Sequence, residues 1–407
     1  MRRVRRLARL FLPAGLVTLA GLILLRSTAL PDSLQRFVHI YPYVVFAVGT
    51  ILGWYFNRSR VVFALLILAV ADATLGRIGS EHAVLDSVDR LVFTALAVLL
   101  PLNLAAYAML KERGLFNARG VRRFACVAAQ VLAMGLIVRL EWRRPTDWLE
   151  YSFLDTRLTT WTAIPQIALG AFGLATVFLV VRCILRRDPI EAAFLAAVVW
   201  AFLALHGIRF GLASTTSLAT AGLALTCGVL ETTYRMAYHD ELTELPGRRA
   251  LIEEFLQVGS SYAVAMVDVD HFKRFNDLFG HEVGDQALRM VAAKLGRVEG
   301  GGRAFRYGGE EFVVLFARMT AAEAVPHMEA VRRSISASCF VLRGPGRPRR
   351  KPTTPKPPTG PRVAVSLTIS IGIAEPDEKK RNPQQVLKAA DKALYRAKSA
   401  GRNRLMV

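Results

Sequence analysis

The chain has 407 residues, of which 53% are hydrophobic, and a formal net charge of +21 at pH 7. This apolar content is high for a wholly soluble protein, and the length allows two or three domains. The apolar residues are concentrated in long blocks within residues 1–230, whereas residues 241–407 have ordinary globular composition. We therefore expect a membrane domain at 1–230, a short helical linker at 231–240 and a soluble domain at 241–407.

The positive charge indicates which partners to expect, and the spacing of the cysteines indicates whether they form a metal site. In a soluble protein this charge would indicate nucleic acid or an acidic surface. Here much of the basic excess lies in short loops between apolar blocks, where Lys and Arg set membrane topology. We expect membrane lipid, and no nucleic acid, as a partner. The cysteines lack metal-site spacing and are expected to be small core hydrophobes; they are Cys126, Cys183, Cys227 and Cys339.

Apolar blocks in residues 1–230 predict a multi-pass α-helical bundle of about eight transmembrane helices. A span needs about 20 mostly apolar residues, and the blocks Val61–Gly76 and Phe124–Val138 are short for a span. The basic run Met1–Arg9 is not a signal peptide in this interpretation, because no small-residue cleavage site follows the first block. The blocks are Leu10–Leu25, Phe37–Phe56, Val61–Gly76, Leu91–Leu110, Phe124–Val138, Trp161–Val181, Ile190–Gly207 and Ala213–Leu230.

The distribution of Lys and Arg among the loops predicts the topology. With the N-terminus inside, segments 1–9, 57–60, 111–123 and 182–188 are cytoplasmic, and they carry more Lys and Arg than the outer loops. Eight spans return the chain to the inside. We therefore expect both termini and the soluble domain to be cytoplasmic.

Asp72 lies within the third predicted span and is the only clear acid that we identify inside a span. A carboxylate there is costly and usually faces the bundle interior or water. It is either a ligand or ion contact, or an acid near the outer end of a short span that reaches the interface. The longest outer loop favours an interfacial aromatic belt over a sensory pocket; its aromatic residues are Trp142, Trp148, Tyr151 and Trp161.

The linker at 231–240 contains no Pro or Gly, so we expect the last span to continue through it as a helix. After it, the strand-like run Tyr262–Val269 ends in Asp268 and is followed by Asp270. Carboxylates at positions i and i+2 of a strand share a face. At the end of a strand this pair either holds a metal or simply terminates the strand.

A glycine pair, Gly308-Gly309, separates two strand-like runs of a predicted hairpin. The pair is expected to supply the positive φ angles of a tight turn, and its bare backbone lets a bulky ligand approach. Glu310 and Glu311 follow directly, and carboxylates suit a hard cation such as Mg²⁺. The alternative is a plain solvent-exposed acidic hairpin.

The other soluble segments alternate between strand and helix patterns. We predict helices at 284–299, at Thr320–Ala337 and from Asn382 onward, and a strand at Val363–Ile373. This order predicts an α+β domain in which helices pack on an antiparallel sheet, the ferredoxin-like βαββαβ arrangement. The segment Arg343–Arg362 holds seven prolines and seven basic residues without an acid, so it reads as an open loop. It is either a tolerated surface insertion or a contact for anionic lipid head groups.

Residues 238–407 resemble the GGDEF family of bacterial diguanylate cyclases, in the Gly-Gly-Glu-Glu-Phe form. Separate motifs carry the resemblance, and they lie at Asp240–Arg249, Asp268–Asp285, Gly308–Phe312, Ser370–Ala374 and Ala390–Asn403. The first motif departs from the family at two turn positions, where Glu244 replaces Gly and Gly247 replaces Asn. The resemblance implies a nucleotidyl-cyclase-like elaboration of the α+β plan and a bacterial inner-membrane location.

The resemblance also implies a metal site and a catalytic pair. Asp268, the backbone carbonyl of Val269 and Glu310 would hold Mg²⁺, with Mn²⁺ as the alternative metal. Glu310 would also act as the base near the attacking hydroxyl, and Lys273 would stabilise charge in the transition state. Glu311 is left open as a second metal contact.

The remaining matched residues imply substrate contacts. Lys398 and Arg402 would reach the phosphates of GTP. Asn276 and Asp285 would read the guanine, and His281 would help to position the substrate.

By this resemblance, the protein condenses two GTP molecules into cyclic di-GMP and releases two pyrophosphates. Each site holds one GTP, so a homodimer is required, and the membrane bundle would control it. A catalytically inactive receptor for GTP or cyclic di-GMP is the main alternative. A transporter with a soluble regulatory domain is the third interpretation, although Asp72 alone is weak support for it.

Many relatives carry Arg-x-x-Asp shortly before the signature, where the pair binds the cyclic product. The equivalent positions here are Glu299 and Gly302. A carboxylate at Glu299 would repel the product's phosphates, and Gly302 has no side chain to read a base. We therefore expect no product feedback at this place.

Overall fold

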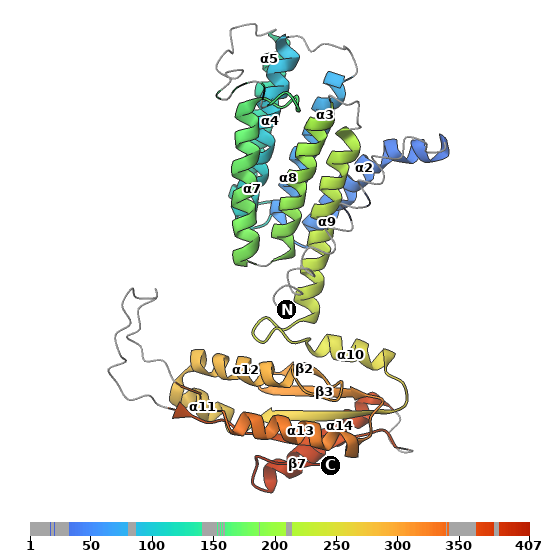
Figure 1. Cartoon of the computed structure of the whole chain (residues 1–407), viewed down its shortest axis with the longest axis vertical. Coiled ribbons are helices and arrows are strands. Elements are labelled where there is room, and N and C mark those ends of the chain that lie inside the picture. Colours follow the sequence, from blue (N-terminus) through green and yellow to red (C-terminus); the bar gives the residue numbers. More distant parts are fainter. Residues whose placement is uncertain are drawn as a thin grey trace, which may run out of the picture. The chain divides into compact units, whose positions relative to one another are not determined.

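A computed structural model gives the structure of the chain (Figure 1). It describes residues 32–79, 87–140, 159–186, 188–208, 214–338, 340–341, 364–377 and 382–407, with single positions at 17, 20, 153, 155 and 157. The chain divides into two compact units, Met1–Tyr234 and Arg235–Val407. Each unit has its own hydrophobic core.

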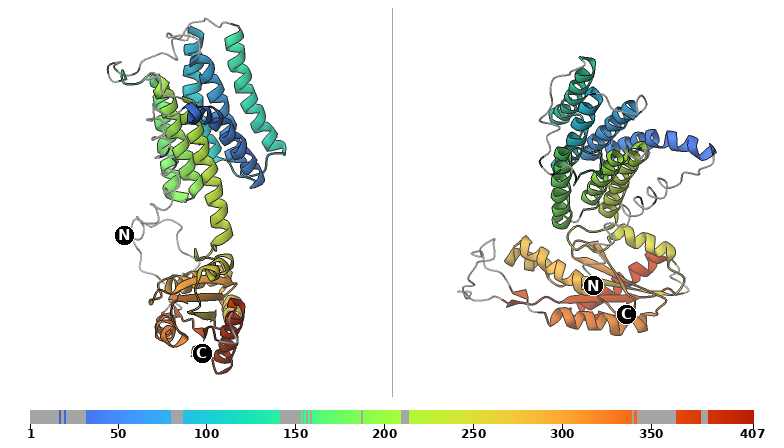
Figure 2. Two further views of the ribbon diagram at one scale, coloured as in Figure 1. Left: turned by 90° about the vertical axis from the view of Figure 1, so that its right-hand side faces the viewer. Right: turned by 45° about the horizontal axis from the view of Figure 1, so that its top comes forward.

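The N-terminal unit is a bundle of long helices (Figures 1 and 2). Its described helices coincide with seven of the predicted apolar blocks, and the first block, Leu10–Leu25, lies outside the described residues apart from positions 17 and 20. The helices are α2 (Asp32–Tyr55), α3 (Ser59–Gly79), α4 (Ser87–Met109), α5 (Ala118–Arg139), α7 (Gln166–Arg186), α8 (Pro189–Gly207) and α9 (Ser214–Tyr238).

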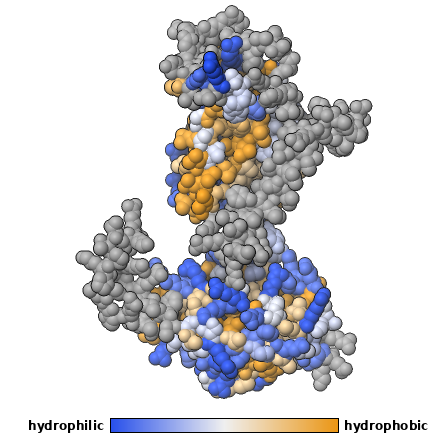
Figure 3. Space-filling view, in the orientation of Figure 1, coloured by the Kyte–Doolittle hydropathy of each residue, from blue (hydrophilic) through white to orange (hydrophobic). Residues whose placement is uncertain are grey.

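Five of the described helices, α3, α4, α5, α7 and α8, are long and apolar enough to cross a membrane. Hydrophobic residues gather on the surface of this unit in Figure 3, and Leu132 and Leu185 are largely exposed to the surroundings. Such a surface fits a lipid environment, because soluble proteins rarely expose large apolar patches. The total of eight spans stays a prediction.

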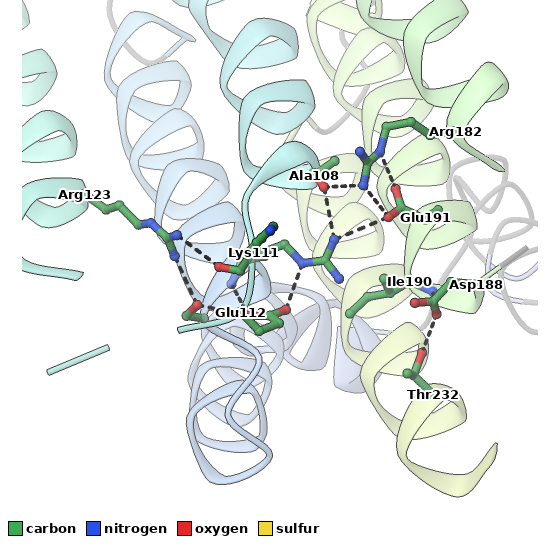
Figure 4. Close-up of polar contacts among 11 residues, drawn as sticks. Ala108, Lys111, Glu112, Arg123, Arg182, Asp188, Ile190, Glu191 and Thr232 are labelled. Carbon is green, nitrogen blue, oxygen red and sulfur yellow. Dashed lines mark hydrogen bonds and ion pairs between the residues drawn. The ribbon is translucent and has the colours of Figure 1, made fainter. Parts of the chain in front are cut away.

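A polar layer joins the helix ends on one side of the bundle (Figure 4). Glu191, at the start of α8, is 0% exposed, and its Oε1 lies 2.5 Å from Arg182 Nη2 and 3.3 Å from Arg60 Nη1. Arg60 Nε also lies 2.8 Å from Glu112 Oε1. Our expectation that Asp72 was the only acid within the spans was therefore wrong. Glu191 is the second residue of the predicted block Ile190–Gly207. The apolar pattern of that block did not indicate that this acid would face two arginines.

The C-terminal unit is a five-stranded sheet in the order β2-β3-β1-β6-β7, with a separate β4-β5 pair. Its strands are β1 (Tyr262–Val269), β2 (Arg303–Gly308), β3 (Glu311–Ala317), β4 (Phe340–Val341), β5 (Ala364–Val365), β6 (Ile369–Ala374) and β7 (Leu405–Met406). Its helices are α10 (Arg248–Gln257), α11 (Phe272–Phe279), α12 (His281–Leu295), α13 (Ala321–Ser336) and α14 (Pro383–Ser399).

Strand β1 is the centre of the sheet and is buried along its whole length. Ala265 and Val267 pack into the core beneath α11, α12 and α13, whereas Val264 and Met266 pack into the core beneath α10 and α14. This alternation is the period of two that a strand between two helical layers requires. Asp268 continues the second series and therefore faces the α14 side.

These features confirm the predicted fold class of a helical bundle followed by an α+β domain. Strands β2, β3, β1 and β6 pair antiparallel as predicted, and the short β7 adds a parallel edge. The single strand predicted at Val363–Ile373 is two strands, β5 and β6, because the backbone between them turns to bond Asp270. The Arg343–Arg362 loop lies outside the described residues.

The turn before α10 is held by Asp240. Its Oδ1 accepts hydrogen bonds from Thr243 N at 2.8 Å and Thr243 Oγ1 at 2.6 Å, and from Arg306 Nη1 at 2.7 Å. Burial raises the pKa of Asp240, but these hydrogen bonds outweigh it, so the pKa is lowered overall. Glu244 in this turn has a φ of 59°, the left-handed conformation that glycine adopts without cost.

Glu244→Gly is expected to stabilise the C-terminal unit by up to about 1 kcal/mol. The left-handed region costs a residue with a Cβ roughly 1–2 kcal/mol, and the greater chain freedom of glycine when unfolded offsets part of that gain. Urea unfolding of a fragment from Glu231 gives the measurement. Glu241→Gly is the control and should destabilise, because no positive φ is recorded at Glu241. A loss of stability in Glu244→Gly would contradict our interpretation that the positive φ of Glu244 is strained.

Candidate active site

Asp268, at the end of β1, is the centre of the site. It is 5% exposed, and its Oδ2 lies 2.9 Å from Lys398 Nζ. Lys398 reaches it because α14 lies directly on β6: a Cβ built on Gly372 would be 2.1 Å from both Ala390 O and Leu394 N. Only glycine permits so close a helix–sheet contact, and the last turn of α14 then carries Lys398 to Asp268.

Glu310 forms the turn between β2 and β3. Strands β1 and β3 pair with Asp268 opposite Glu311, and Val269 N donates to Glu310 O at 3.4 Å. The pairing therefore brings the turn to the end of β1, beside Asp268. The structure thus unites Asp268, Val269 and Glu310, the three residues assigned to the metal by resemblance.

The expected role of the glycine pair is partly wrong. Neither Gly308 nor Gly309 has a positive φ, because a register shift between Arg306 and Gly308 lets the hairpin close differently. The bare backbone itself remains: a Cβ on Gly309 would meet nothing within 4 Å. The glycines thus leave open space at the tip, as expected for ligand approach.

Burial is the main reason why the pKa values of the two carboxyl groups at this site are raised. It raises the pKa of Asp268, and the hydrogen bond from Lys398 offsets it only in part. Burial also raises the pKa of Glu310, and the neighbouring Asp268 raises it further. A cation bound beside these two carboxylates would offset the cost of their charge.

The donor set fits Mg²⁺. Two carboxylates and a backbone carbonyl are hard oxygen ligands, and Mg²⁺ is usually held by one or two carboxylates together with substrate phosphates. Among the residues that the structure describes, no three His, Cys, Asp or Glu side chains gather as a self-sufficient metal site. Asp268, the Val269 carbonyl and Glu310 would therefore hold a metal that the nucleotide's own oxygens help to bind.

A second group of predicted residues meets where α11 and α12 join. Asn276 Oδ1 is buried without a hydrogen-bond partner, and a Cβ on Gly284 would lie 1.8 Å from this oxygen. Gly284 therefore makes room for the Asn276 amide, and Asp285 is the next residue on α12. His281 begins α12 and is exposed. An unsatisfied amide oxygen is suited to a ligand that carries hydrogen-bond donors.

The two remaining predicted cations lie on different elements. Lys273 is exposed in the first turn of α11. Arg402 follows α14 in a turn with a φ of 61°, and its charge lowers the pKa of Asp268 after larger contributions from burial and Lys398. Arg402 therefore belongs to the Asp268 group, whereas the structure gives no contact between Lys273 and that group.

Asp270 has a role that the sequence did not reveal. Its carboxylate accepts hydrogen bonds from Ser370 Oγ at 2.6 Å, Thr368 Oγ1 at 2.7 Å and Asn403 N at 3.1 Å. The metal alternative for the Asp268–Asp270 pair therefore fits Asp268 alone. Asp270 instead anchors the turn that contains Arg402, and Arg332 supports the same turn by donating to Asn403 O at 3.0 Å.

Arg306 is a second positioning residue that the sequence did not reveal. It donates from Nη2 to Gly309 O at 2.6 Å, in the tip that presents Glu310, and it bonds Asp240 as described above. The Asp240 motif and the signature hairpin are thus parts of one structure. The only sequence signal was that both motifs match the same family.

Three comparisons relate the chain to known proteins. The family model described as diguanylate cyclase, GGDEF domain, matches residues 237–349 and 349–404. The response regulator PleD of Caulobacter vibrioides is 32% identical over 182 residues, 43% of this chain and 37% of that protein. The diguanylate cyclase DgcP of Pseudomonas aeruginosa is 37% identical over 186 residues, 44% of this chain and 25% of that protein. The chain thus spans well under half the length of these curated relatives.

Among solved structures, the chain is similar to the coiled coil and GGDEF domain of DgcB from Caulobacter crescentus in complex with c-di-GMP. The sequence identity is 31%, the TM-score is 0.40, and the match covers 46% of this chain and 94% of that one.

Asp268→Asn is expected to change how stability depends on pH. A carboxyl whose folded pKa is raised above its ordinary value of 3.8 stabilises the fold below that value, and this contribution is lost as pH rises through the folded pKa. Without metal, the unfolding free energy of the unchanged protein should therefore fall, relative to that of Asp268→Asn, as pH rises above about 4. Chemical denaturation at several pH values in EDTA measures it. A difference that does not vary with pH would contradict the raised pKa.

Proposed function

We propose that this chain is a membrane-bound diguanylate cyclase, because the GGDEF family model matches residues 237–349 and 349–404 of the C-terminal unit. It condenses two GTP molecules into cyclic di-GMP and two pyrophosphates. The observation that carries the proposal is the convergence of Asp268, Glu310 and Lys398 at one end of β1, beside an open glycine tip.

The site must first neutralise the negative charge of the GTP triphosphate. A divalent metal, when bound, neutralises phosphate charge and polarises the α-phosphate. Asp268, the Val269 carbonyl and Glu310 would hold it. Lys398 and Arg402 lie on the Asp268 side and would bind phosphate oxygens, and Lys273 would approach from α11 to stabilise charge that develops in the transition state.

Recognition of guanine is assigned to the α11–α12 junction. Asp285 would accept hydrogen bonds from guanine N1–H and N2–H₂, because a carboxylate presents two acceptors side by side. The unpartnered Asn276 Oδ1 would satisfy its own requirement on the same base. His281, exposed at the start of α12, would help to orient the nucleotide.

The reaction requires two copies of the unit. In each half, the 3′-oxygen of one GTP forms a bond to the α-phosphorus of the other, and the bond from that phosphorus to the bridging oxygen breaks to release pyrophosphate. Glu310 would accept the hydroxyl proton at a carboxylate oxygen, a role that its raised pKa favours. Because one site holds one GTP, we propose a homodimer.

The membrane assignment rests on the five long apolar helices and on the loop charges. We propose that residues 1–230 span the bacterial inner membrane with about eight helices, and that the cyclase unit is cytoplasmic, where GTP is available. Residues 231–240 would join the two as a short linker, and α9 is one helix from Ser214 to Tyr238. A short helical connection favours control of the cyclase by the bundle.

The alternative is a catalytically inactive receptor for GTP or cyclic di-GMP. Retention of both metal carboxylates, of Lys398 and of the open tip favours the enzyme, because a receptor needs none of them for base recognition. Glu311 stays open as a second metal contact. A transporter is less favoured, since Glu191 is neutralised by two arginines. Its support is then Asp72, whose buried Oδ1 has no hydrogen-bond partner.

Glu310→Gln is expected to abolish cyclic di-GMP synthesis without unfolding the protein. The change removes one metal charge and the base at a partly exposed turn, and loss of a single electrostatic contact of this kind already costs about 10²–10³ in rate. Chromatography of products formed from GTP and Mg²⁺ measures it. Glu241→Gln, which neutralises an exposed acid in the Asp240 turn, is the control and should retain activity. Similar turnover in both variants would refute the assignment.

Added cyclic di-GMP is expected not to inhibit the unchanged protein through residues 299–302. A Cβ on Gly302 would lie 2.6 Å from a ring carbon of Phe316 and 2.8 Å from Val298 Cγ1, so Gly302→Asp should destabilise the unit by about 1–3 kcal/mol. Glu299→Arg, combined with Gly302→Asp, should therefore lose stability without gaining feedback, whereas Glu299→Arg alone should stay folded. The test measures the turnover of GTP at increasing concentrations of cyclic di-GMP, together with calorimetric titration of cyclic di-GMP binding. Micromolar non-competitive inhibition of the unchanged protein would contradict this interpretation.

A further inference from the structure

A cavity lies within the N-terminal unit, between α3, α4 and α5. Its volume is about 420 Å³, and most of its lining is apolar, including Val92, Leu96 and Met134. Sites for small molecules are concave, mainly apolar and about 300–1,000 Å³ in volume, with a few polar groups that fix orientation. The cavity meets these criteria of size and composition, and nothing in the cyclase reaction uses it.

Helix α5 has its closest contacts with α3 near its N-terminus, before the residues that line the cavity. Near its N-terminus, Arg123 Nη1 donates to Ser59 Oγ at 3.1 Å, and the ring of Phe124 packs against Phe63 with centroids 4.8 Å apart. Farther along, residues of α5 between Val127 and Val138 line the cavity. The helix is therefore anchored to α3 at its start, whereas farther along one of its faces borders the cavity.

A pair of carboxamides from α4 and α5 is among the polar groups that line the cavity. Asn103 Nδ2 on α4 donates to Gln130 Oε1 on α5 at 2.9 Å, and Gln130 Nε2 donates to Asn103 Oδ1 at 3.3 Å. A carboxamide has two N–H donors and two acceptor sites. This exchange uses one of each, so both side chains keep a donor and an acceptor in apolar surroundings, where unmet polar groups are costly.

The charges in the lining argue against an ionic ligand. The charged lining residues are Arg77 and Asp89, one of each sign, so the lining presents no net charge. We propose that this cavity binds an uncharged amphipathic molecule: a hydrocarbon body with one hydroxyl or carbonyl oxygen. The body fills the apolar part, and the oxygen bonds to the spare groups of Asn103 and Gln130. This site goes beyond the cyclase function and does not depend on it.

A photoreactive decanol that carries a diazirine tests the proposal on the full chain in lipid nanodiscs. Mass spectrometry locates the label, and unlabelled decanol and decane compete at equal mole fraction in the bilayer. We expect label on α4 and α5 near Asn103 and Gln130. Decanol should compete about threefold to tenfold better than decane, the value of one net hydrogen bond. Equal competition would show a site that holds hydrocarbon only, such as a bilayer acyl chain, and would overturn the proposal.

Matched variants separate binding at the cavity from general partitioning. Val127 is buried and lines the cavity, so Val127→Phe should reduce the labelling several-fold. Val121→Phe makes the same change at an exposed position of α5 outside the lining and should leave labelling unchanged.

The double variant Asn103→Leu/Gln130→Leu removes both carboxamides of the pair and should abolish the preference for decanol over decane, even if Val127→Phe does not fold. Equal labelling in Val127→Phe and Val121→Phe, or an unchanged preference in Asn103→Leu/Gln130→Leu, would refute the site. Nucleotide turnover is not part of the readout, so failure here leaves the cyclase proposal standing.

Discussion

The register of β1 against β3 is the constraint on which the candidate active site depends. It places Asp268 opposite Glu311, so the preceding turn must deliver Glu310 to the end of β1. On the other side of β1, β6 carries Gly372 beneath α14, and the helix delivers Lys398. A slip of one residue would turn Asp268 to the opposite helical layer and separate it from both.

The two acids at the end of β1 are treated in opposite ways. Asp270 is buried, and hydroxyl and amide donors from β6 and the Asn403 turn surround it, which satisfies its acceptors within the protein. Asp268 is equally buried, but it pairs with Lys398, and its pKa is still raised because burial outweighs the nearby positive charges. Buried charge without full compensation is a feature of functional sites. The contrast explains why one acid supports the fold while the other remains suited to a cation.

The order of strand-like and helix-like segments predicted the fold class, and the resemblance of the motifs to the GGDEF family implied that Asp268 and Glu310 share a site. The sequence did not reveal the role of Asp270, whose partners Ser370 and Asn403 lie 100 and 133 residues farther along the chain. Nor did it give the φ of Glu244, because glycine is the usual residue for that conformation. The positive φ angles predicted for Gly308 and Gly309 were wrong for a related reason. A bulge depends on how the two strands pair, and the residue types at the tip do not determine that pairing.

In the bundle, too, the sequence did not reveal which charged residues would pair. Glu191 follows a Pro-Ile pair and precedes an apolar run, and its two arginine partners come from α3 and α7. A buried ion pair contributes little stability relative to well-packed apolar groups, whereas removal of one partner is strongly destabilising. We therefore interpret the polar layer as a device that fixes one arrangement of the helix ends. Asp188, which caps α8, also bonds Thr232 on α9, so the arrangement extends to the last helix of the bundle.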